Sequence, residues 1–137
     1  MRNLKLKSLG KKGSAYFGLE TFKAPSHASI ITCESDEVTA LCPVTNQPDW
    51  YKVVIDYSPD RLCVESKSLK LYLHTFRNKG HFCEAFADII AKDLFAAMKP
   101  VSIDVSVTQK SRGGISIIGR ASLSKAVDGG FRSTFRK

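Results

Sequence analysis

The segment VSIDVSVT, residues 101–108, alternates apolar and polar side chains at every position. Successive side chains of a β-strand point to opposite faces, so this alternation predicts a strand in a sheet with one covered face. The segment RGGISIIGRAS, residues 112–122, is expected to supply its antiparallel partner. These two strands need a hydrophobic layer on their covered side, and the preceding sequence provides candidates for it.

Two helices are predicted upstream, over residues 68–78 and 81–99. In SLKLYLHTFRN, the first of them, apolar residues recur at i, i+3, i+4 and i+7, which is the helical period. The second, HFCEAFADIIAKDLFAAMK, repeats this pattern and ends before Pro100. We expect Gly80, between the two, to adopt the left-handed conformation that closes many helices.

Two more strands are predicted before the helices, ASIITC at 28–33 and KVVIDY at 52–57. The turn residues SPDR at 58–61 lead into LCVE, which predicts a hairpin. The order strand–strand–helix–helix–strand–strand indicates an α+β fold with both helices on one face of an antiparallel sheet. Such a sheet has two open edges that invite pairing, so we expect a closed ring of subunits that forms a shared barrel.

Length and composition are those of an ordinary soluble globular protein of one domain, with 137 residues. The N-terminal segment lacks the continuous apolar stretch of a signal peptide, and no apolar run is long enough for a membrane span. The four cysteines show neither CxxC spacing nor a cluster with histidine, so no metal site is predicted. We therefore expect a cytoplasmic protein with reduced thiols.

The net charge of +8 is concentrated at the two ends. Residues 1–13 carry five basic and no acidic residues, and residues 110–137 carry seven basic and one acidic residue, whereas the stretch between them carries nine basic and twelve acidic residues. We expect a basic N-terminal arm over 1–25, a catalytic domain over 26–122 and a basic C-terminal tail over 123–137. Such tails are either solvated or in contact with anions such as nucleic acid, and the sequence leaves both open.

The segment TALCPVTNQPDW, residues 39–50, places Cys42 directly before a proline and Asp49 seven residues later. A thiol near a carboxylic acid suits covalent catalysis, in which sulfur attacks an electrophilic carbon and the acid supplies a proton. The same residues also suit structural roles, because free cysteines are often buried and aspartates often cap turns. This segment alone leaves both interpretations open.

The strongest signal for function is VESKSLKLYLHTFRNKG, which begins at Val64. Its residues 65–72, ESKSLKLY, resemble without interruption the signature of the 7-cyano-7-deazaguanine reductases, which reduce a nitrile to a primary amine in the queuosine pathway of tRNA modification. ALCPVTNQPD resembles the nucleophile region of that family, and RGGI at 112–115 resembles a third segment. The resemblance spans residues 34–118 approximately. It implies a tunnelling fold, in which β2α2β2 subunits form ring-shaped barrels, here two stacked pentamers, with active sites between subunits.

The resemblance also implies the chemistry. In that family the cysteine of the LCP segment, here Cys42, is the nucleophile that forms a covalent thioimide with the nitrile carbon. Asp49 matches the acid that protonates the nitrile nitrogen, and two molecules of NADPH supply the two hydrides. No GxGxxG segment is present, so NADPH binding of the Rossmann type is not expected.

Further residues match positions that bind the substrate and the cofactor in the family. Glu84 matches the carboxylate that accepts hydrogen bonds from the 2-amino-lactam edge of the deazaguanine. The other expected substrate-pocket residues are Glu65, Ser66 and Cys83. The expected cofactor side consists of Lys67, Lys70, Arg112, Gly113 and Gly114, where cations suit phosphates and glycines admit close approach. The family commonly has a histidine directly before this glutamate, so Cys83 departs from its pattern, and His81 is a candidate substitute.

Several alternatives stay open. The thioimide could be resolved by ammonia instead of hydride, as in the amidine-forming branch of the superfamily that is used in archaeosine synthesis. Cys42 and Cys83 could form a disulfide that protects the nucleophile from over-oxidation. A non-catalytic protein that binds nucleic acid through its basic tails, and an enzyme that acts on a base within a polynucleotide, are further hypotheses.

Overall fold

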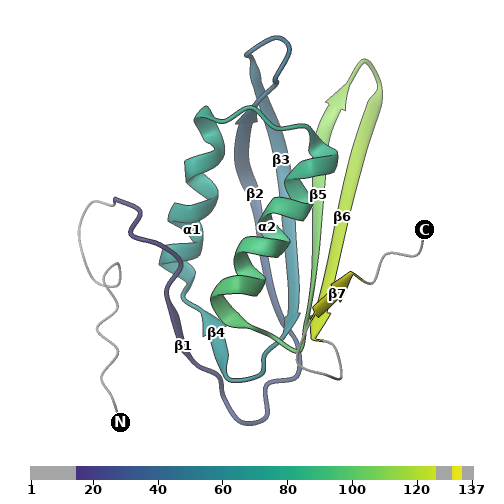
Figure 1. The fold of residues 1–137 in the computed structure, drawn as a ribbon. Coiled ribbons are helices and arrows are strands. Elements are labelled where there is room, and N and C mark those ends of the chain that lie inside the picture. The colour runs from purple at the N-terminus through teal and green to yellow at the C-terminus, as the bar shows by residue number, and fades with distance from the viewer. Residues whose placement is uncertain (1–14, 126–130, 134–137) are drawn as a thin grey trace.

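The computed structural model describes residues 15–125 and the backbone of residues 131–133 (Figure 1). The elements in chain order are β1 (Thr21–Lys23), β2 (Ile31–Leu41), β3 (Pro48–Ser58), β4 (Leu62–Val64), α1 (Ser66–His74), the 3-10 helix η1 (Thr75–Asn78), α2 (Cys83–Met98), β5 (Ser102–Arg112), β6 (Ile115–Lys125) and β7 (Phe131–Ser133). Much of the predicted basic arm and tail lies outside the described residues. No helix in the described part of the chain has the length and apolar character needed to cross a bilayer.

An antiparallel sheet forms one layer of the fold, and the two helices form the other (Figure 1). The strands lie in the order β2-β3-β5-β6-β7, and β7 pairs only with the last residues of β6, from Leu123 to Lys125. Both helices cover the same face of the sheet, and α2 packs on β5 and β6. The predicted α+β arrangement of four main strands and two helices is confirmed.

Side-chain alternation along the strands explains which face the helices cover. Ile103, Val105 and Val107 of β5 point into the core and are at most 1 % exposed. Polar residues occupy the opposite face, where the Thr32 hydroxyl donates to the Asp56 carboxylate at 2.5 Å. The prediction of one covered face, drawn from residues 101–108, is therefore confirmed.

The predicted hairpin between β3 and the LCVE segment is wrong, because β3 has no free edge. One side of β3 pairs with β2, and the other side pairs with β5. The LCVE segment forms β4 instead, which pairs with β1 in a separate two-stranded ribbon. Residues 21–23, expected as part of a loose arm, are therefore a strand, and the Glu65 N–H donates to the Glu20 carbonyl at 2.8 Å beside it.

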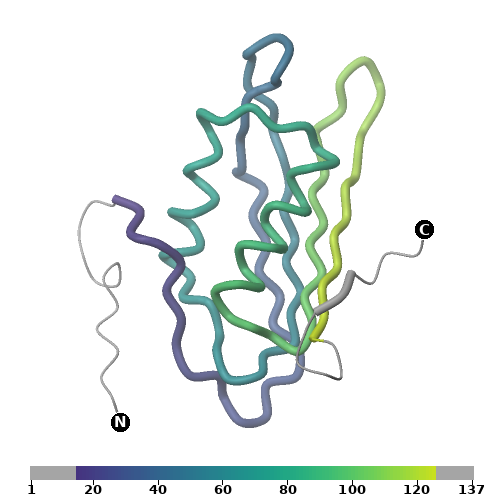
Figure 2. The backbone as a smooth tube through the Cα atoms, viewed as in Figure 1, coloured from purple at the N-terminus to yellow at the C-terminus, as the bar shows by residue number. Residues whose placement is uncertain are grey.

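Gly80 does not adopt the left-handed conformation predicted for it. The chain leaves η1 in extended backbone at Lys79, and Gly80 pairs with Leu41 at the end of β2. The Leu41 N–H donates to the Lys79 carbonyl at 2.9 Å, and the His81 N–H donates to the Leu41 carbonyl at 3.2 Å. The segment between the helices, whose course Figure 2 traces, is thereby tied to the end of β2. This attachment brings the residues that follow β2 close to the start of α2.

Candidate active site

Three connections meet at one end of the sheet, at the top of Figure 1: the β2–β3 loop, the start of α2 and the β5–β6 turn. They carry seven of the predicted site residues, Cys42, Asp49, Cys83, Glu84, Arg112, Gly113 and Gly114. We call this end the catalytic end of the sheet.

The β2–β3 loop is closed on itself, and it presents the Cys42 thiol to hydrogen-bond donors. The Cys42 N–H donates to the Gln47 carbonyl at 2.8 Å, and the Asn46 N–H donates to the Cys42 carbonyl at 2.9 Å. The Thr45 hydroxyl and the N–H groups of Thr45 and Val44 lower the pKa of Cys42 to about 7, although the charge of Asp49 raises it. A partly exposed thiol with such a pKa is substantially ionised at neutral pH, which is the state that attacks carbon.

Asp49 is the second residue of β3, and its side chain faces the helices. It is only 4 % exposed, and its carboxylate forms an ion pair with the Arg112 guanidinium, which lies at the end of the neighbouring strand β5. Arg112 also donates to the Pro48 carbonyl at 3.2 Å. The carboxylate beside the candidate nucleophile is therefore held in place from the adjacent strand.

Two further buried polar groups lie here, one on Tyr51, which the sequence did not point to, and one on His81, the candidate substitute for the family histidine. Among the described residues, the Tyr51 hydroxyl and His81 Nε2 are buried without a hydrogen-bond partner. Burial, and then the charges of Asp49 and Cys83, raise the pKa of Tyr51. Burial and the nearby Lys79 lower the pKa of His81, whose ring stacks on Phe86 at a centroid distance of 5.9 Å. The period of β3 signals one of them, because it places Tyr51 on the same face as Asp49.

Cys83 points into the sheet and away from the surface. Its thiol donates to the carbonyls of Val107 and Ile117, both at 3.5 Å, and the residue is 2 % exposed. Burial raises the pKa of this thiol. Cys42 and Cys83 are both free thiols in this structure, so the disulfide between them stays a hypothesis. The predicted contact between Cys83 and a substrate likewise stays a prediction.

Glu84 lies in the first turn of α2 and is exposed. The start of α2 sits tightly against β6 at Gly119, because a Cβ there would stand 2.8 Å from the Cys83 carbonyl oxygen and 3.5 Å from the Glu84 Cα. A carboxylate at this position can accept two N–H donors from a ligand that approaches the catalytic end.

The remaining substrate-side prediction, Glu65, caps a helix. Its two carboxylate oxygens accept from the N–H groups of Lys67 and Ser68, each at 2.8 Å, and the residue is 5 % exposed. The helix that it caps, α1, begins at the end of the sheet opposite to the catalytic end (Figure 1). Within one chain, Glu65 therefore does not lie with Cys42 and Asp49.

The residues that follow Glu65 lie along α1. Ser66 and Lys70 line a hollow of about 460 Å³ between α1 and β2, together with His74. Lys67 is partly buried, and Lys70 is exposed. The predicted site residues thus form two groups in one chain, one at the catalytic end and one along the first turns of α1.

Gly113 and Gly114 form the two-residue turn between β5 and β6. Both have positive φ, 56° and 79°, and the flanking residues Arg112 and Ile115 pair with each other. A turn with two left-handed central residues matches the twist of a β-hairpin, and glycine adopts it without strain. This turn accounts for both glycines, and their contact with a cofactor stays a prediction.

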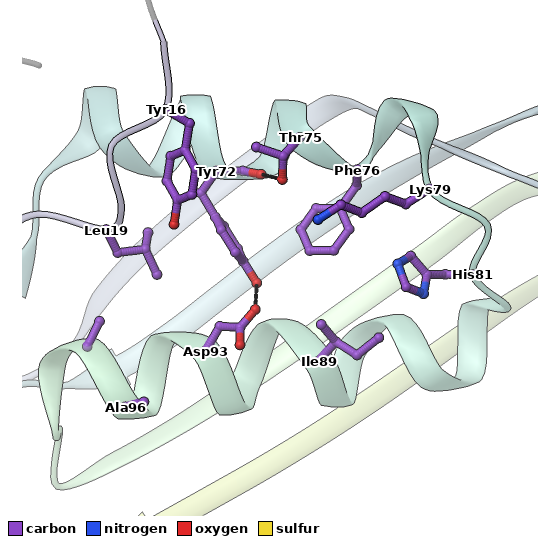
Figure 3. A pocket seen from close by; sticks show the side chains of 11 residues that line it. Tyr16, Leu19, Tyr72, Thr75, Phe76, Lys79, His81, Ile89, Asp93 and Ala96 are labelled. Atoms are coloured by element: carbon purple, nitrogen blue, oxygen red, sulfur yellow. Dashed lines mark hydrogen bonds between the residues drawn. The ribbon is translucent and has the colours of Figure 1, made fainter.

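A further pocket, of about 650 Å³, opens between α1 and α2 (Figure 3). Its wall includes Tyr72, whose hydroxyl donates to Asp93 at 2.6 Å, and Tyr16, whose ring lies 6.1 Å from that of Tyr72. None of the predicted catalytic, substrate-pocket or cofactor residues lines it, but the candidate substitute His81 does. Over residues 15–125, no group of three or more His, Cys, Asp or Glu side chains is arranged to hold a metal ion.

Comparisons with known proteins identify the family of this chain. A family profile described as QueF-like protein matches residues 48–128. A protein of Frankia casuarinae named NADPH-dependent 7-cyano-7-deazaguanine reductase is 46 % identical over 99 residues, which are 72 % of this chain and 79 % of that protein. A protein of the same name from Syntrophus aciditrophicus is 42 % identical over 123 residues, 88 % of each chain. Another from Alkaliphilus metalliredigens is 50 % identical over 101 residues, 72 % of this chain and 61 % of that one.

A solved structure has the same fold. The crystal structure of an archaeosine synthase QueF-Like in the apo form superposes with a TM-score of 0.67 over 77 % of this chain and 99 % of that chain, at 21 % identity. At this identity the likeness supports the fold alone. From the family profile and the sequence relatives together, the chain belongs to the QueF-like protein family.

Proposed function

We propose that this chain reduces the nitrile of 7-cyano-7-deazaguanine to the primary amine of 7-aminomethyl-7-deazaguanine, with NADPH as the reductant. The observation that carries the proposal is the Cys42 thiol, with a pKa of about 7, close to the buried carboxyl group of Asp49. Relatives of this chain bear the reductase name. In the proposed reaction, Cys42 is the nucleophile and Asp49 is the acid. We place the enzyme in the cytoplasm, where its thiols stay reduced.

The first step is the addition of the Cys42 thiolate to the nitrile carbon. A carbon–sulfur bond forms, the C≡N triple bond becomes a C=N double bond, and the nitrogen receives the electron pair. Asp49, having taken up the proton of the Cys42 thiol, donates that proton to the nitrogen, which gives a neutral thioimide. Thr45 and the loop N–H groups keep the sulfur ionised before the attack. NADPH, when bound, supplies the hydride in each of the two reductions.

The deazaguanine is held through its polar edge. Glu84 is exposed at the start of α2, and its two oxygens suit the adjacent N–H donors of a 2-amino-lactam. Because Gly119 lets α2 approach the sheet closely, this carboxylate is fixed relative to the strands that carry Asp49 and Arg112. The nucleophile and the substrate grip then belong to one rigid end of the subunit.

We further propose that neighbouring subunits complete the site in a closed ring, with two stacked pentamers as the expected assembly. Two observations support this. The Ser66–Lys70 part of the signature lies away from the catalytic end of its own chain. Within the described residues β2 pairs only with β3, and β6 carries exposed isoleucines next to its open edge, at 115, 117 and 118. Edge pairing of β2 with a neighbour's β6 would cover these residues.

The cofactor would bind at the α1 side of such an interface. On its α1 side the hollow offers the Ser66 hydroxyl, the Lys70 ammonium and the His74 imidazole, which can donate to phosphate. Its β2 side carries Glu34 and Glu37, whose carboxylates repel an anion, so the phosphates would lie against α1. Lys67 lies beside it on α1, and the Arg112–Gly113–Gly114 turn would approach from the catalytic end of the other subunit. Replacing Lys70 by alanine should raise the KM for NADPH about tenfold, with a smaller effect on the KM for the nitrile.

The direct test is NADPH oxidation in the presence of 7-cyano-7-deazaguanine, for the wild type and for Cys42→Ala. We expect turnover in the wild type and none in the variant. Without NADPH, a new near-ultraviolet absorbance on mixing enzyme and substrate should report the thioimide, again only with Cys42 present. If ammonia without NADPH gives an amidine product, the chain belongs to the amidine-forming branch and the reductase proposal is wrong.

A further inference from the structure

A second buried polar side chain of β3 lies on the same face of the strand as the candidate acid. Tyr51 lies two residues after Asp49 on the same face of the strand, opposite Val38 on β2 and Gln109 on β5. Its side chain is 2 % exposed, and its ring meets Phe86 of α2 edge to face, with centroids 5.0 Å apart. The aromatic ring therefore has a packing role that does not use the hydroxyl group.

The Tyr51 hydroxyl is buried without a hydrogen-bond partner among the described residues. Buried hydroxyl groups normally have partners, because the loss of water is otherwise uncompensated. Another tyrosine on the same face of this strand follows that rule, since the Tyr57 hydroxyl accepts from the Val64 N–H at 3.2 Å. Of these two tyrosines of β3, Tyr51 is therefore the exception, and it is the one nearer the catalytic end.

The ionisable groups that act on this hydroxyl are those of the candidate site. Asp49, Cys83 and Cys42 raise the pKa of Tyr51, and Arg112 lowers it. The nearest alternative, Cys83, is already committed, because its thiol donates to the Val107 and Ile117 carbonyls.

The chemistry of the acid favours a phenol as its partner. Arg112, which now pairs with Asp49, has only donors, so it can donate to the carboxylate or to the carbonyl oxygen of the acid but cannot accept from the O–H of the acid. A phenol has one donor and can also accept. It can accept from the O–H of the acid until the nitrile nitrogen takes over that hydrogen bond, and it can donate to the carboxylate after the proton has left. Tyr51 can therefore hold Asp49 through the whole step.

We propose that Tyr51 is a positioning residue for this reaction: in the substrate-bound site its hydroxyl hydrogen-bonds to the Asp49 carboxyl group and aims it at the nitrile nitrogen. The inference rests on the proposed nitrile reduction. It assigns Tyr51 a polar role that Cys83, with its thiol bonded to the sheet backbone, does not fill.

The test is Tyr51→Phe, which keeps the ring and its contact with Phe86 and removes only the oxygen. We expect the rate of thioimide formation, followed by absorbance in single-turnover mixing without NADPH, to fall at least tenfold. The affinity for the substrate should change less than threefold. Thermal stability should be unchanged or higher, because an unpaired buried hydroxyl is removed.

Tyr57→Phe is the matched control, on the same face of the same strand but with its hydroxyl bonded to Val64. We expect it to lower the melting temperature and to leave the rate of thioimide formation unchanged. A Tyr51→Phe protein that forms the thioimide at the wild-type rate would overturn the inference. So would a loss of rate that only follows a loss of stability.

A double-mutant cycle with Asp49→Asn locates the effect. If Tyr51 acts through Asp49, then Tyr51→Phe causes no further loss in the Asp49→Asn background. If the two substitutions instead lower the rate of thioimide formation by independent factors that multiply, Tyr51 does not act through Asp49. A wild-type protein that forms no thioimide at all would instead reject the proposed function, which separates the two failures.

Discussion

The carbonyl oxygen of Cys83 lies 2.8 Å from the point where a Cβ on Gly119 would stand. The contact joins the first turn of α2 to β6, and Gly119 itself has an ordinary strand conformation. A glycine is therefore needed here because a side chain would collide with the start of α2, and not because of its own backbone angles. Since the obstacle is backbone, it cannot move away as a side chain would.

Replacing Gly119 by alanine should push the start of α2 away from the sheet. We expect a loss of about 1–3 kcal/mol in the free energy of unfolding, as for other overpacked sites, and weaker binding of the deazaguanine because Glu84 moves with the helix. Urea denaturation measures the first effect. Gly80→Ala is the control, because its nearest heavy atom, the Pro43 Cα, is at an ordinary 3.5 Å. Equal stability of the two variants would contradict this account.

Replacing Thr45 by valine should make Cys42 less reactive at neutral pH. The Thr45 hydroxyl is the largest of the influences that lower the pKa of Cys42 to about 7. Its removal destabilises the thiolate, so the pKa rises and the midpoint of alkylation by iodoacetamide moves to higher pH. Mass spectrometry of the Cys42 peptide over pH 5–10, a range of roughly five units around this midpoint, gives the shift. Thr39→Val, on β2, should leave the midpoint in place.

Replacing Glu65 by alanine should destabilise α1. Both carboxylate oxygens accept from N–H groups of the first turn, so we expect a loss of roughly 1–2 kcal/mol in the free energy of unfolding. Glu65→Asp is the informative comparison, because aspartate is itself a good capping residue and should recover most of the stability. If alanine at this position leaves the stability unchanged, the cap is not significant, and the predicted contact with substrate becomes its main role.

Replacing Glu84 by glutamine should weaken substrate binding and leave the fold intact. The residue is exposed, so the free energy of unfolding should change by less than about 0.5 kcal/mol. The loss of a charged hydrogen bond to the substrate should raise its Kd about tenfold or more, measured by calorimetry in the Cys42→Ala background. Asp88→Asn, one turn later, is the control, because Asp88 is paired with Lys92 at 2.7 Å. Similar Kd values for both variants would show that Glu84 does not contact the substrate.

Local patterns in the sequence predicted the main elements correctly. The alternation of 101–108 is set by which side chains face water, and the same rule operates in the folded strand β5. The predicted hairpin from β3 into LCVE was wrong because strand pairing is not decided locally. Both edges of β3 are already paired, one with β2 and the other with β5. The predicted left-handed conformation of Gly80 was wrong for a related reason, since its conformation is set by pairing with Leu41.

The sequence predicted which residues form the candidate site, but not how their side chains are bonded. The resemblance named Cys42 and Asp49, and the fold brings both to the catalytic end of the sheet. It also named Glu65, but nothing in the signature shows that both of its oxygens cap α1. Tyr51 was missed because an unpartnered hydroxyl is a property of the packed interior, which one strand's period does not reveal.

The separation of the signature into two groups has a genetic consequence. In the ring proposed above, Cys42→Ala and Lys70→Ala would damage opposite sides of the same interface, so each variant subunit would supply the side that the other lacks. When they are co-expressed, about one interface in four of the hybrid rings would be intact, and a cell with both defective copies would regain part of the missing modification.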